Sequence, residues 1–357
     1  MIISLIFIAI TAIFYGCYYY IYGSIDIIYK AWDGPSYIVV AKSLYDPHLA
    51  SVNNIIQSVD INEHWTWLPA HFPLYPLLIR AFSFLGYFQA MLGIALLSSL
   101  AATIALYEFF RAIQISKHPL WLTLPFLILS PRWFIVSHTG TTEPLFVALM
   151  LVSFIFFAKK RSLPAAIFAT LCLLVRPQGV FLGLGYGLVA IIELLRTKNL
   201  PMIFKKYAWF LLMPVGLFAV FTFFYFRTGD FFAFFPAIAL FKHFEFTPFA
   251  TFTYQNFNVE TYWQEINALM FVLAGSACFM VMKRRFWWLG VISFVSLIPL
   301  IFMRHSDISR YMIPLLPVMF VAYQPLLERK SFVAGVFVMA PAVMRYAINF
   351  LNFNHAP

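Results

Sequence analysis

Charged residues are scarce in this chain. Aspartate, glutamate, lysine and arginine make up 11% of its 357 residues, whereas 62% are hydrophobic and the mean hydropathy is +0.84. A soluble globular domain carries about 25% charged residues, so this composition excludes one. Apolar runs of about 20 residues, the length that crosses a hydrocarbon core about 30 Å thick, recur along the chain. We therefore predict an all-α, polytopic membrane protein.

Cysteine is equally scarce. The three cysteines, Cys17, Cys172 and Cys278, all lie in apolar runs, which argues against a disulfide framework. The opening stretch MIISLIFIAI has neither a basic region nor a cleavage site of small residues. We therefore expect it to be a retained first span rather than a removed signal peptide.

We expect eleven spans, with the N-terminus inside and the C-terminus outside. Segment 72–87 is apolar enough for a short span, but it contains Pro73, Pro76 and Arg80. Counting it as a span would also move the basic links 111–117 and 159–161 to the outer side, so we interpret it as an outer-leaflet or re-entrant helix. The expected spans are 3–22, 89–110, 119–136, 144–158, 163–175, 179–195, 207–226, 266–282, 286–303, 311–327 and 331–350.

The net charge of +10 would fit nucleic-acid binding, but the positions of the charges argue against it. With these spans, 14 of the 24 lysine and arginine residues fall in short links on one side of the membrane. The positive-inside rule makes that side cytoplasmic. Eleven of the 14 acidic residues and seven of the eight histidines fall on the opposite side. The basic charge is thus a topology signal, and we expect any chemistry on the non-cytoplasmic side.

Two outer loops are long, 23–88 and 227–265. Because no internal repeat or soluble domain is evident, we expect residues 1–357 to form a single membrane domain. In the first loop, SYIVVAKSLY repeats apolar residues at near-helical spacing, which predicts an amphipathic helix on the membrane surface. The second loop is too apolar to stand free in water, so we expect it to lie on the bilayer or close over a cavity.

The stretch KAWDGPSY follows the first expected span and places Asp33 in a turn at the membrane edge. One interpretation is structural, because an aspartate before Gly-Pro-Ser and a helical run is a good N-cap. The other is functional, because a carboxylate held there can take a proton from a sugar hydroxyl as a general base. The sequence allows both roles together.

Two histidines, His64 and His71, lie among tryptophans later in the same loop. Their spacing matches no strong zinc pattern, so we predict no metal site. We interpret them as polar anchors beside Trp65 and Trp67, since membrane proteins place tryptophan at headgroup depth.

Four further residues combine charge with a position near hydrocarbon. Glu143 at the start of a span complements the helix dipole in the structural interpretation. Arg176 lies between two apolar runs, where a charge usually faces a cavity or a partner. Arg304 and Arg310 share one short outer turn, and arginine binds phosphate oxygens bidentately. The structural alternative is that Arg310 pairs with Asp307 or Glu143.

Five short motifs occur in an order that resembles a known superfamily. They are WDGPSY, HFPLYPLLIR, TTEPLF, RPQG and SRYMIPLLP, and they extend from about residue 31 to residue 317. The chain resembles the GT-C glycosyltransferases, and within them the phosphatidylinositol-glycan class V mannosyltransferase type and its bacterial relatives. It departs from that pattern where Ala31 precedes the Trp-Asp pair and where Thr142 and Pro144 flank Glu143.

The resemblance implies a GT-C-like fold and an inverting glycosyltransferase. Such an enzyme moves one sugar, typically mannose, from a polyprenyl-phosphate donor to a glycan, glycolipid or protein acceptor. Asp33 would be the catalytic residue that deprotonates the acceptor hydroxyl, while Arg176, Arg310 and Arg304 would stabilise the phosphate leaving group. The residues expected to bind the sugar and the acceptor are Trp32, Tyr37, His64, His71, His138, Glu143 and Gln178.

The expected ligands follow from the same resemblance. The sequence has no glycine-rich nucleotide-binding loop, which fits a lipid-linked donor rather than a nucleotide sugar in the site. We expect no cofactor and no nucleic-acid partner, and a divalent cation is allowed but not indicated. Membrane lipids are expected partners, with a small membrane subunit as a further candidate. The host membrane would be a bacterial cytoplasmic membrane, or the endoplasmic reticulum in a eukaryote.

Two alternatives remain open at this point. A lipid-linked glycan polymerase or ligase would share the topology and the outward-facing arginines, but it would use a preassembled glycan on a pyrophosphate. A transporter or flippase would also have many spans, and such proteins often show inverted repeats and ionisable residues near the midplane. The sequence shows no such repeat, and most of its ionisable residues lie near span ends, which favours an enzyme.

Overall fold

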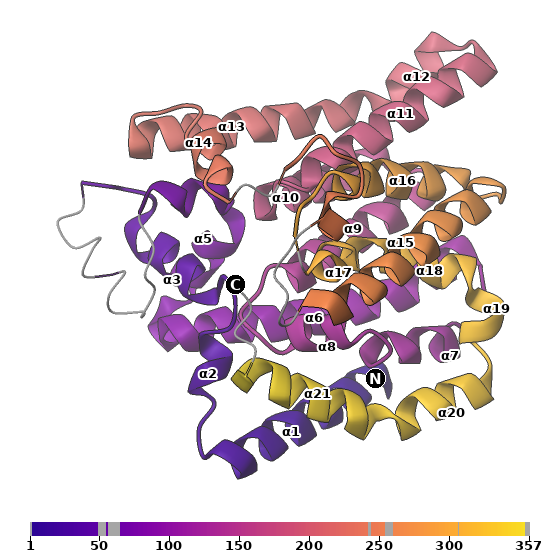
Figure 1. The fold of residues 1–357 in the computed structure, drawn as a ribbon. Helices are drawn as coiled ribbons and strands as arrows, with labels where there is room; N and C mark the ends of the chain where they lie inside the picture. Colours follow the sequence, from indigo (N-terminus) through magenta and orange to yellow (C-terminus); the bar gives the residue numbers. More distant parts are fainter. Residues whose placement is uncertain are drawn as a thin grey trace.

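The computed structural model describes residues 2–48, 55, 65–241, 244–253, 260–305 and 307–353, and in these ranges the protein is all-α. A single isolated bridge, between Phe244 and Met303, is the one β-type pairing in the described residues. Figure 1 shows how the helices are arranged. Their bounds are α1 Ile2–Tyr22, α2 Asp26–Tyr29, α3 Gly34–Ser43, η1 Trp65–Ala70, α5 Leu74–Ala81, η2 Ser83–Leu85, α6 Tyr87–Ile113, α7 Pro119–Thr123, η3 Leu124–Leu127, α8 Pro131–Ser137, α9 Glu143–Ala158, α10 Ser162–Val175, α11 Gly179–Thr197, α12 Leu200–Tyr207, η4 Ala208–Leu211, α13 Leu212–Thr228, α14 Phe234–Ala239, η5 Ala250–Thr253, α15 Glu260–Met282, α16 Trp287–Ile301, α17 Ile308–Tyr311, η6 Ile313–Leu315, α18 Leu316–Ala322, α19 Gln324–Leu327, α20 Lys330–Val338 and α21 Ala340–Phe353.

Several of these helices are long and apolar enough to cross a membrane. Five pass on length and composition, and the number rises to seven if each of two bent helix pairs counts as one span. The bent pairs are Pro119–Leu127 with Pro131–Ser137, and Lys330–Val338 with Ala340–Asn352. These helices indicate a multi-pass membrane protein. The other four of the eleven expected spans correspond to shorter apolar helices of 10–17 residues, so helix length alone does not establish eleven.

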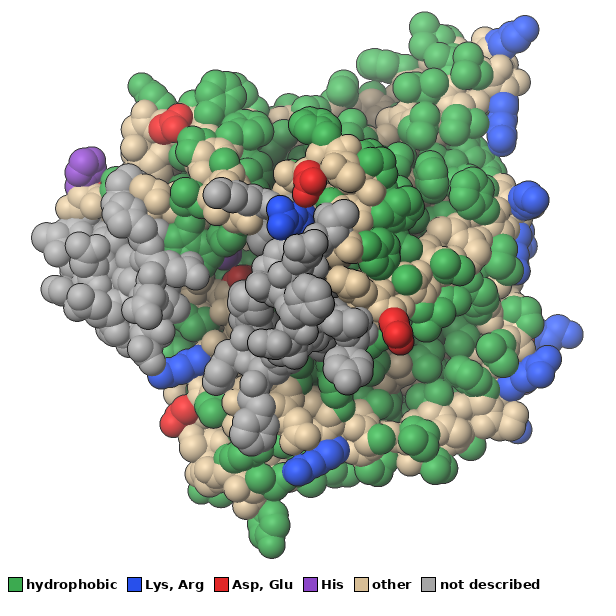
Figure 2. Space-filling model, viewed as in Figure 1, with side chains coloured by type: hydrophobic (Ala, Val, Ile, Leu, Met, Phe, Trp, Pro, Cys, Tyr) green, Lys and Arg blue, Asp and Glu red, His purple; other side chains and the backbone are tan. Residues whose placement is uncertain are grey.

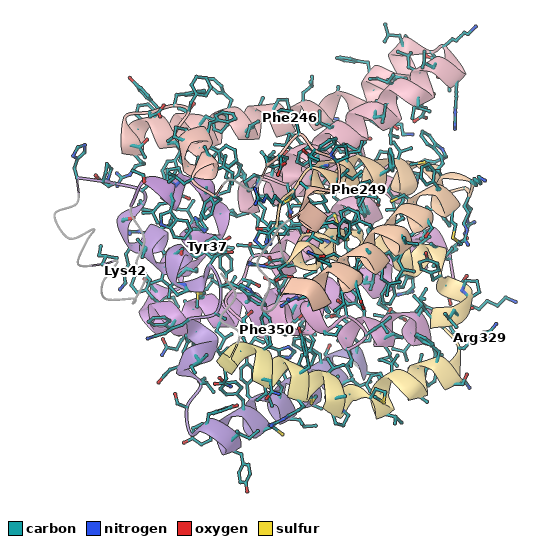
Figure 3. The ribbon with its side chains drawn as sticks, viewed as in Figure 1. Tyr37, Lys42, Phe246, Phe249, Arg329 and Phe350 are labelled. Atoms are coloured by element: carbon teal, nitrogen blue, oxygen red, sulfur yellow. The ribbon has the colours of Figure 1, made fainter. Side chains whose placement is uncertain are left out.

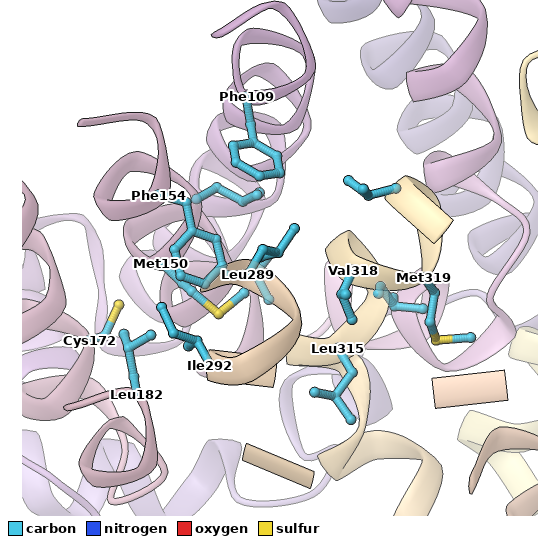
Figure 4. Packing of buried hydrophobic residues seen from close by; sticks show 14 of the residues in the cluster. Phe109, Met150, Phe154, Cys172, Leu182, Leu289, Ile292, Leu315, Val318 and Met319 are labelled. Carbon is cyan, nitrogen blue, oxygen red and sulfur yellow. The ribbon is translucent and has the colours of Figure 1, made fainter. Parts of the chain in front are cut away.

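The long helices pack against one another along their lengths. In the main core, α9 lies against α6 and α10, while α16 lies against α11 and α15. Figure 4 shows Phe109 of α6 and Phe154 of α9 in this core, with ring centroids 5.9 Å apart. Gly185 lets α11 approach α16 closely, because a Cβ atom there would lie 2.9 Å from the backbone of Ile292. Small residues commonly allow such approaches between membrane helices.

Helix α3 forms where the sequence predicts a helix, but the prediction that it lies on the membrane surface is wrong. All but one of its residues are buried, because α3 packs against α5 and α6. Two arginines hold its C-terminal end: Arg80 donates to the carbonyl of Ala41 at 2.9 Å, and Arg227 donates to that of Leu44 at 2.8 Å. Cations at a helix C-terminus satisfy carbonyls that have no partner within the helix.

Segment 72–87 contains α5 and η2, which together are too short to cross a bilayer. In the second long outer loop, α14 packs against η1 of the first loop. Farther along that loop, the backbone N–H of Phe249 donates to the carbonyl of Ile301 at 2.6 Å. The described parts of both loops therefore rest on the helical body.

Candidate active site

The Asp33 carboxylate turns away from the helix that it precedes. Trp32 has a left-handed φ of +49°, and Asp33 then occupies the N-cap position of α3. Its side chain makes no capping hydrogen bond, so the N-cap interpretation is wrong for the carboxylate. Instead Asp33 Oδ2 accepts a hydrogen bond from Arg310 Nη2 at 2.8 Å. In this bond both partners are charged, whereas a backbone N–H is a neutral donor, so the Coulomb attraction of the guanidinium favours Arg310 as the partner.

Arg310 links Asp33 to a second carboxylate. Its Nε donates to Glu143 Oε1 at 2.6 Å, and Arg176 Nη1 lies 2.6 Å from the same oxygen. Arg176 also donates to Thr142 Oγ1 at 3.0 Å. Asp33, Glu143, Arg176 and Arg310 thus form one connected group, the charge cluster. Its two acids and two bases balance, which reduces the cost of burial.

The members of the charge cluster differ in exposure. The side chains of Glu143, Arg310 and Arg176 are 2%, 6% and 12% exposed, whereas that of Asp33 is 38% exposed. Asp33 is therefore the member that a ligand reaches from outside. Its Oδ1 accepts no hydrogen bond from any residue in the described part of the chain.

Aromatic side chains surround the cluster. The guanidinium of Arg310 lies over the ring of Trp32 at 4.8 Å, and that of Arg176 lies 5.9 Å from the ring of Tyr311. Tyr37, labelled in Figure 3, makes a 3.2 Å hydrogen bond to Thr142 through its hydroxyl group. Flat aromatic faces beside polar groups suit a sugar ring, which has an apolar face and hydroxyls at its edge.

His71 packs beside these aromatic side chains. Its ring packs edge-on against Tyr37, with centroids 4.9 Å apart, and against Trp67 at 4.7 Å. Burial lowers the pKa of His71, and the nearby Asp33 carboxylate opposes this only in part. His71 is therefore neutral at pH 7.

Asp33 is charged at neutral pH. Burial raises the pKa of its carboxyl, but the charge of Arg310, that of His71 (protonated at the low pH where Asp33 titrates) and, less strongly, that of Arg176 lower it to about 2. A carboxylate with so low a pKa is a weak base while Arg310 holds it. Asp33 therefore becomes a stronger base only if Arg310 weakens its hydrogen bond to the carboxylate.

Three buried polar atoms at this site have no hydrogen-bond partner among the described residues. They are Glu143 Oε2, His71 Nδ1 and Trp32 Nε1. A buried polar atom without a partner costs about 1–3 kcal/mol, so such atoms usually bind water or a ligand. Near Asp33, the Trp32 indole N–H is thus a donor without a protein partner, and the His71 ring nitrogen and one Glu143 oxygen are also unpartnered.

Other expected site residues lie elsewhere. Arg304 is 45% exposed and pairs with Glu245 at 3.9 Å. His138 lies between α1 and α8, where its ring nitrogens are 3.2 Å from Thr11 Oγ1 and 2.7 Å from the carbonyl of Phe134. Gln178 is partly exposed on the turn after Arg176. His64 lies outside the described residues.

Sequence reasoning missed a buried ion pair next to the cluster. Arg132 Nε of α8 lies 2.9 Å from Asp307 Oδ1, and both side chains are less than 10% exposed. The expected pairing of Arg310 with Glu143 is present, but Asp307 pairs with Arg132, not with the guanidinium of Arg310. The missed signal was an arginine inside the expected span 119–136, because a charge in a span needs a partner.

The described residues contain no group of three or more histidine, cysteine, aspartate or glutamate side chains that could hold a metal ion. No family model matches the chain, and no curated protein matches it.

Proposed function

We propose that the protein is an integral-membrane glycosyltransferase that transfers one sugar, mannose, from a polyprenyl-phosphate donor to an acceptor hydroxyl with inversion. The proposal includes eleven spans in a GT-C-like arrangement and an active site on the non-cytoplasmic side. The observation that carries it is the charge cluster: one accessible carboxylate, Asp33, at the end of a buried network that contains two arginines.

In this mechanism Asp33 is the general base. Its Oδ1 takes the proton of the acceptor hydroxyl while the acceptor oxygen attacks the anomeric carbon. The bond between that carbon and the phosphate oxygen breaks, and polyprenyl phosphate leaves with the electron pair. Attack opposite to the leaving group inverts the anomeric configuration.

The arginines would stabilise the leaving phosphate. Arg176 and Arg310 keep N–H groups that no described residue accepts from, so each can add a bond to an anion without leaving Glu143. A phosphate that draws Arg310 toward itself also weakens its hold on Asp33. The pKa of Asp33 then rises toward its ordinary value of about 4, and the carboxylate becomes a stronger base once the donor is bound.

The neighbours of Asp33 would bind the sugar. Trp32 and Tyr37 offer aromatic faces, and the unpartnered Glu143 Oε2 and His71 Nδ1 are placed to bond hydroxyl groups. Arg304, His138, Gln178 and His64 remain in the proposal as secondary candidates.

The test is sugar transfer by purified protein in lipid with radiolabelled polyprenyl-phosphate mannose and an acceptor extract. Asp33→Asn keeps the shape of the side chain but removes its basicity, so we expect transfer to fall by at least about 100-fold, within the range of general-base contributions. Asp26→Asn is the matched control, because Asp26 is an exposed acid on the neighbouring α2. Transfer by Asp33→Asn at the wild-type rate would refute the assignment.

A further inference from the structure

A polar recess lies at the opposite end of helix α9 from the charge cluster. Its volume is about 190 Å³. Helix α9 begins at Glu143 in the cluster and reaches the recess at Phe157, about 20 Å farther along its axis. The other lining residues come from the ends of α11 and α12 and the start of α16. They are Val189, Glu193, Arg196, Thr197, Lys206, Tyr207, Trp287 and Trp288.

The one acid in the recess is already neutralised. Lys206 Nζ lies 2.7 and 2.9 Å from the two carboxylate oxygens of Glu193, and the Tyr207 hydroxyl donates to the same carboxylate at 2.6 Å. This bonding lowers the contribution of Glu193 to the local potential, so the carboxylate does not repel an incoming anion strongly.

The remaining charge is positive. The guanidinium of Arg196 lies over the ring of Trp287 at 4.6 Å, and no carboxylate of the described residues pairs with it. The lining thus carries two cations, Arg196 and Lys206, and one acid that Lys206 already pairs with. This balance favours a phosphate or another compact anion. Figure 2 shows lysine and arginine side chains projecting along this edge of the molecule.

The surroundings of the recess are apolar. Leu195, Phe204 and Trp209 are 71%, 68% and 49% exposed, so the ends of α11 and α12 offer a hydrocarbon-like surface beside the basic group. Tryptophan beside arginine and lysine at the end of spanning helices is typical of headgroup depth in a membrane. A ligand that suits both surfaces has an anionic head and acyl chains.

We propose that this recess binds the headgroup of an anionic phospholipid. The phosphate accepts hydrogen bonds from Arg196 and from the remaining N–H of Lys206, and an acyl chain lies along Phe204 and Leu195. Basic pockets between membrane helices bind anionic headgroups in this way. The site is independent of the proposed sugar transfer, since no member of the charge cluster contributes to it.

The test uses native mass spectrometry of purified protein carrying phosphatidylglycerol or phosphatidylcholine. Wild type should retain phosphatidylglycerol in preference, and Arg196→Gln should retain it about tenfold less, the effect of one lost charge-assisted hydrogen bond. Lys198→Gln is the control: it removes an equal charge two residues farther along the chain, where the side chain does not line the recess, and it should retain lipid as wild type does. Lys206 is left unchanged because its loss would unpair Glu193.

Three results would overturn the proposal. Equal retention of phosphatidylglycerol by wild type and Arg196→Gln would show that Arg196 does not bind the lipid. Equal loss of lipid in Arg196→Gln and Lys198→Gln would show a general attraction to the basic surface instead. Inorganic phosphate or glycerol phosphate that raises the melting temperature as much as phosphatidylglycerol would make the occupant a free anion. An unchanged melting temperature of Arg196→Gln in phosphatidylcholine confirms that the variant is folded.

Discussion

Two acids lie beside the short helix α17, and they differ in protonation although each pairs with an arginine. Asp33 pairs with Arg310 at 2.8 Å, and the pKa of Asp33 falls to about 2. Asp307 pairs with Arg132 at 2.9 Å, yet burial raises the pKa of Asp307 more than the charges of Arg132 and Arg310 lower it. One neighbouring cation does not by itself decide the protonation of a carboxyl.

The hydrogen bond from Arg310 accounts for the difference in pKa, and the two side chains also differ in exposure. The Asp33 side chain is 38% exposed and accepts a charge-assisted hydrogen bond, whereas that of Asp307 is 9% exposed. Burial raises the pKa of both carboxyls, and the opposing effect is larger at Asp33, where the Arg310 side chain adds a hydrogen bond to its charge. The Asp33 region suits chemistry, because its carboxylate is ionised and accessible. The flanking pair of Arg132 and Asp307 instead ties α17 to α8, and this contact positions Arg310 as a member of the charge cluster.

Among the variants considered, the removal of Arg310 should have the largest effect on stability and on sugar transfer. Arg310→Met leaves Asp33 without its partner and Glu143 with only Arg176, so we expect a loss of about 3–5 kcal/mol in the free energy of unfolding. We also expect loss of sugar transfer. Denaturant unfolding in detergent measures the first effect. The neighbouring Arg304→Met is the control, because Arg304 is 45% exposed. Equal stability of the two variants would contradict a structural role for the cluster.

Removing Arg132 should have a smaller effect. Arg132→Met leaves Asp307 unpaired, but that carboxyl already has a raised pKa and can become neutral, so we expect about 1–3 kcal/mol. The double variant Arg132→Met with Asp307→Leu should recover part of this loss, because a buried pair can often be replaced by apolar side chains. If the double variant loses as much stability as the sum of the losses in the two single variants, the ion pair does not account for the effect of Arg132→Met.

The pH dependence of stability should separate the two acids with opposite signs. The folded-state pKa of Asp33 is lowered to about 2, so its contribution is present above its ordinary value of about 4 and is lost as pH falls toward 2. The raised pKa of Asp307 favours the fold at low pH, and this contribution is lost as pH rises through its folded-state pKa.

Melting temperatures between about pH 5 and pH 2 would measure these effects, since the ordinary aspartate pKa lies inside that range. Relative to wild type, Asp33→Asn should lose less stability on acidification, and Asp307→Asn should lose more. Parallel curves for the two variants would mean that the difference between the two acids does not exist in solution.

Much of this protein could be predicted from its sequence. Hydropathy is a local property that adds along the chain, so composition and apolar runs were enough to predict an all-α membrane protein and the position of most of its long helices. Chemical type and location also singled out Asp33, Glu143, Arg176 and Arg310 one at a time, because charges near hydrocarbon are costly and few.

Only the tertiary structure decided how those residues combine. Asp33 and Arg310 are 277 residues apart in the chain, and no local pattern indicates that they meet or that Asp33 leaves the helix cap. The burial of α3 and the pairing of Arg132 with Asp307 likewise depend on which helices pack side by side. Local sequence determines where a segment lies relative to water and lipid, whereas the partner of a buried charge is set by contacts between distant segments.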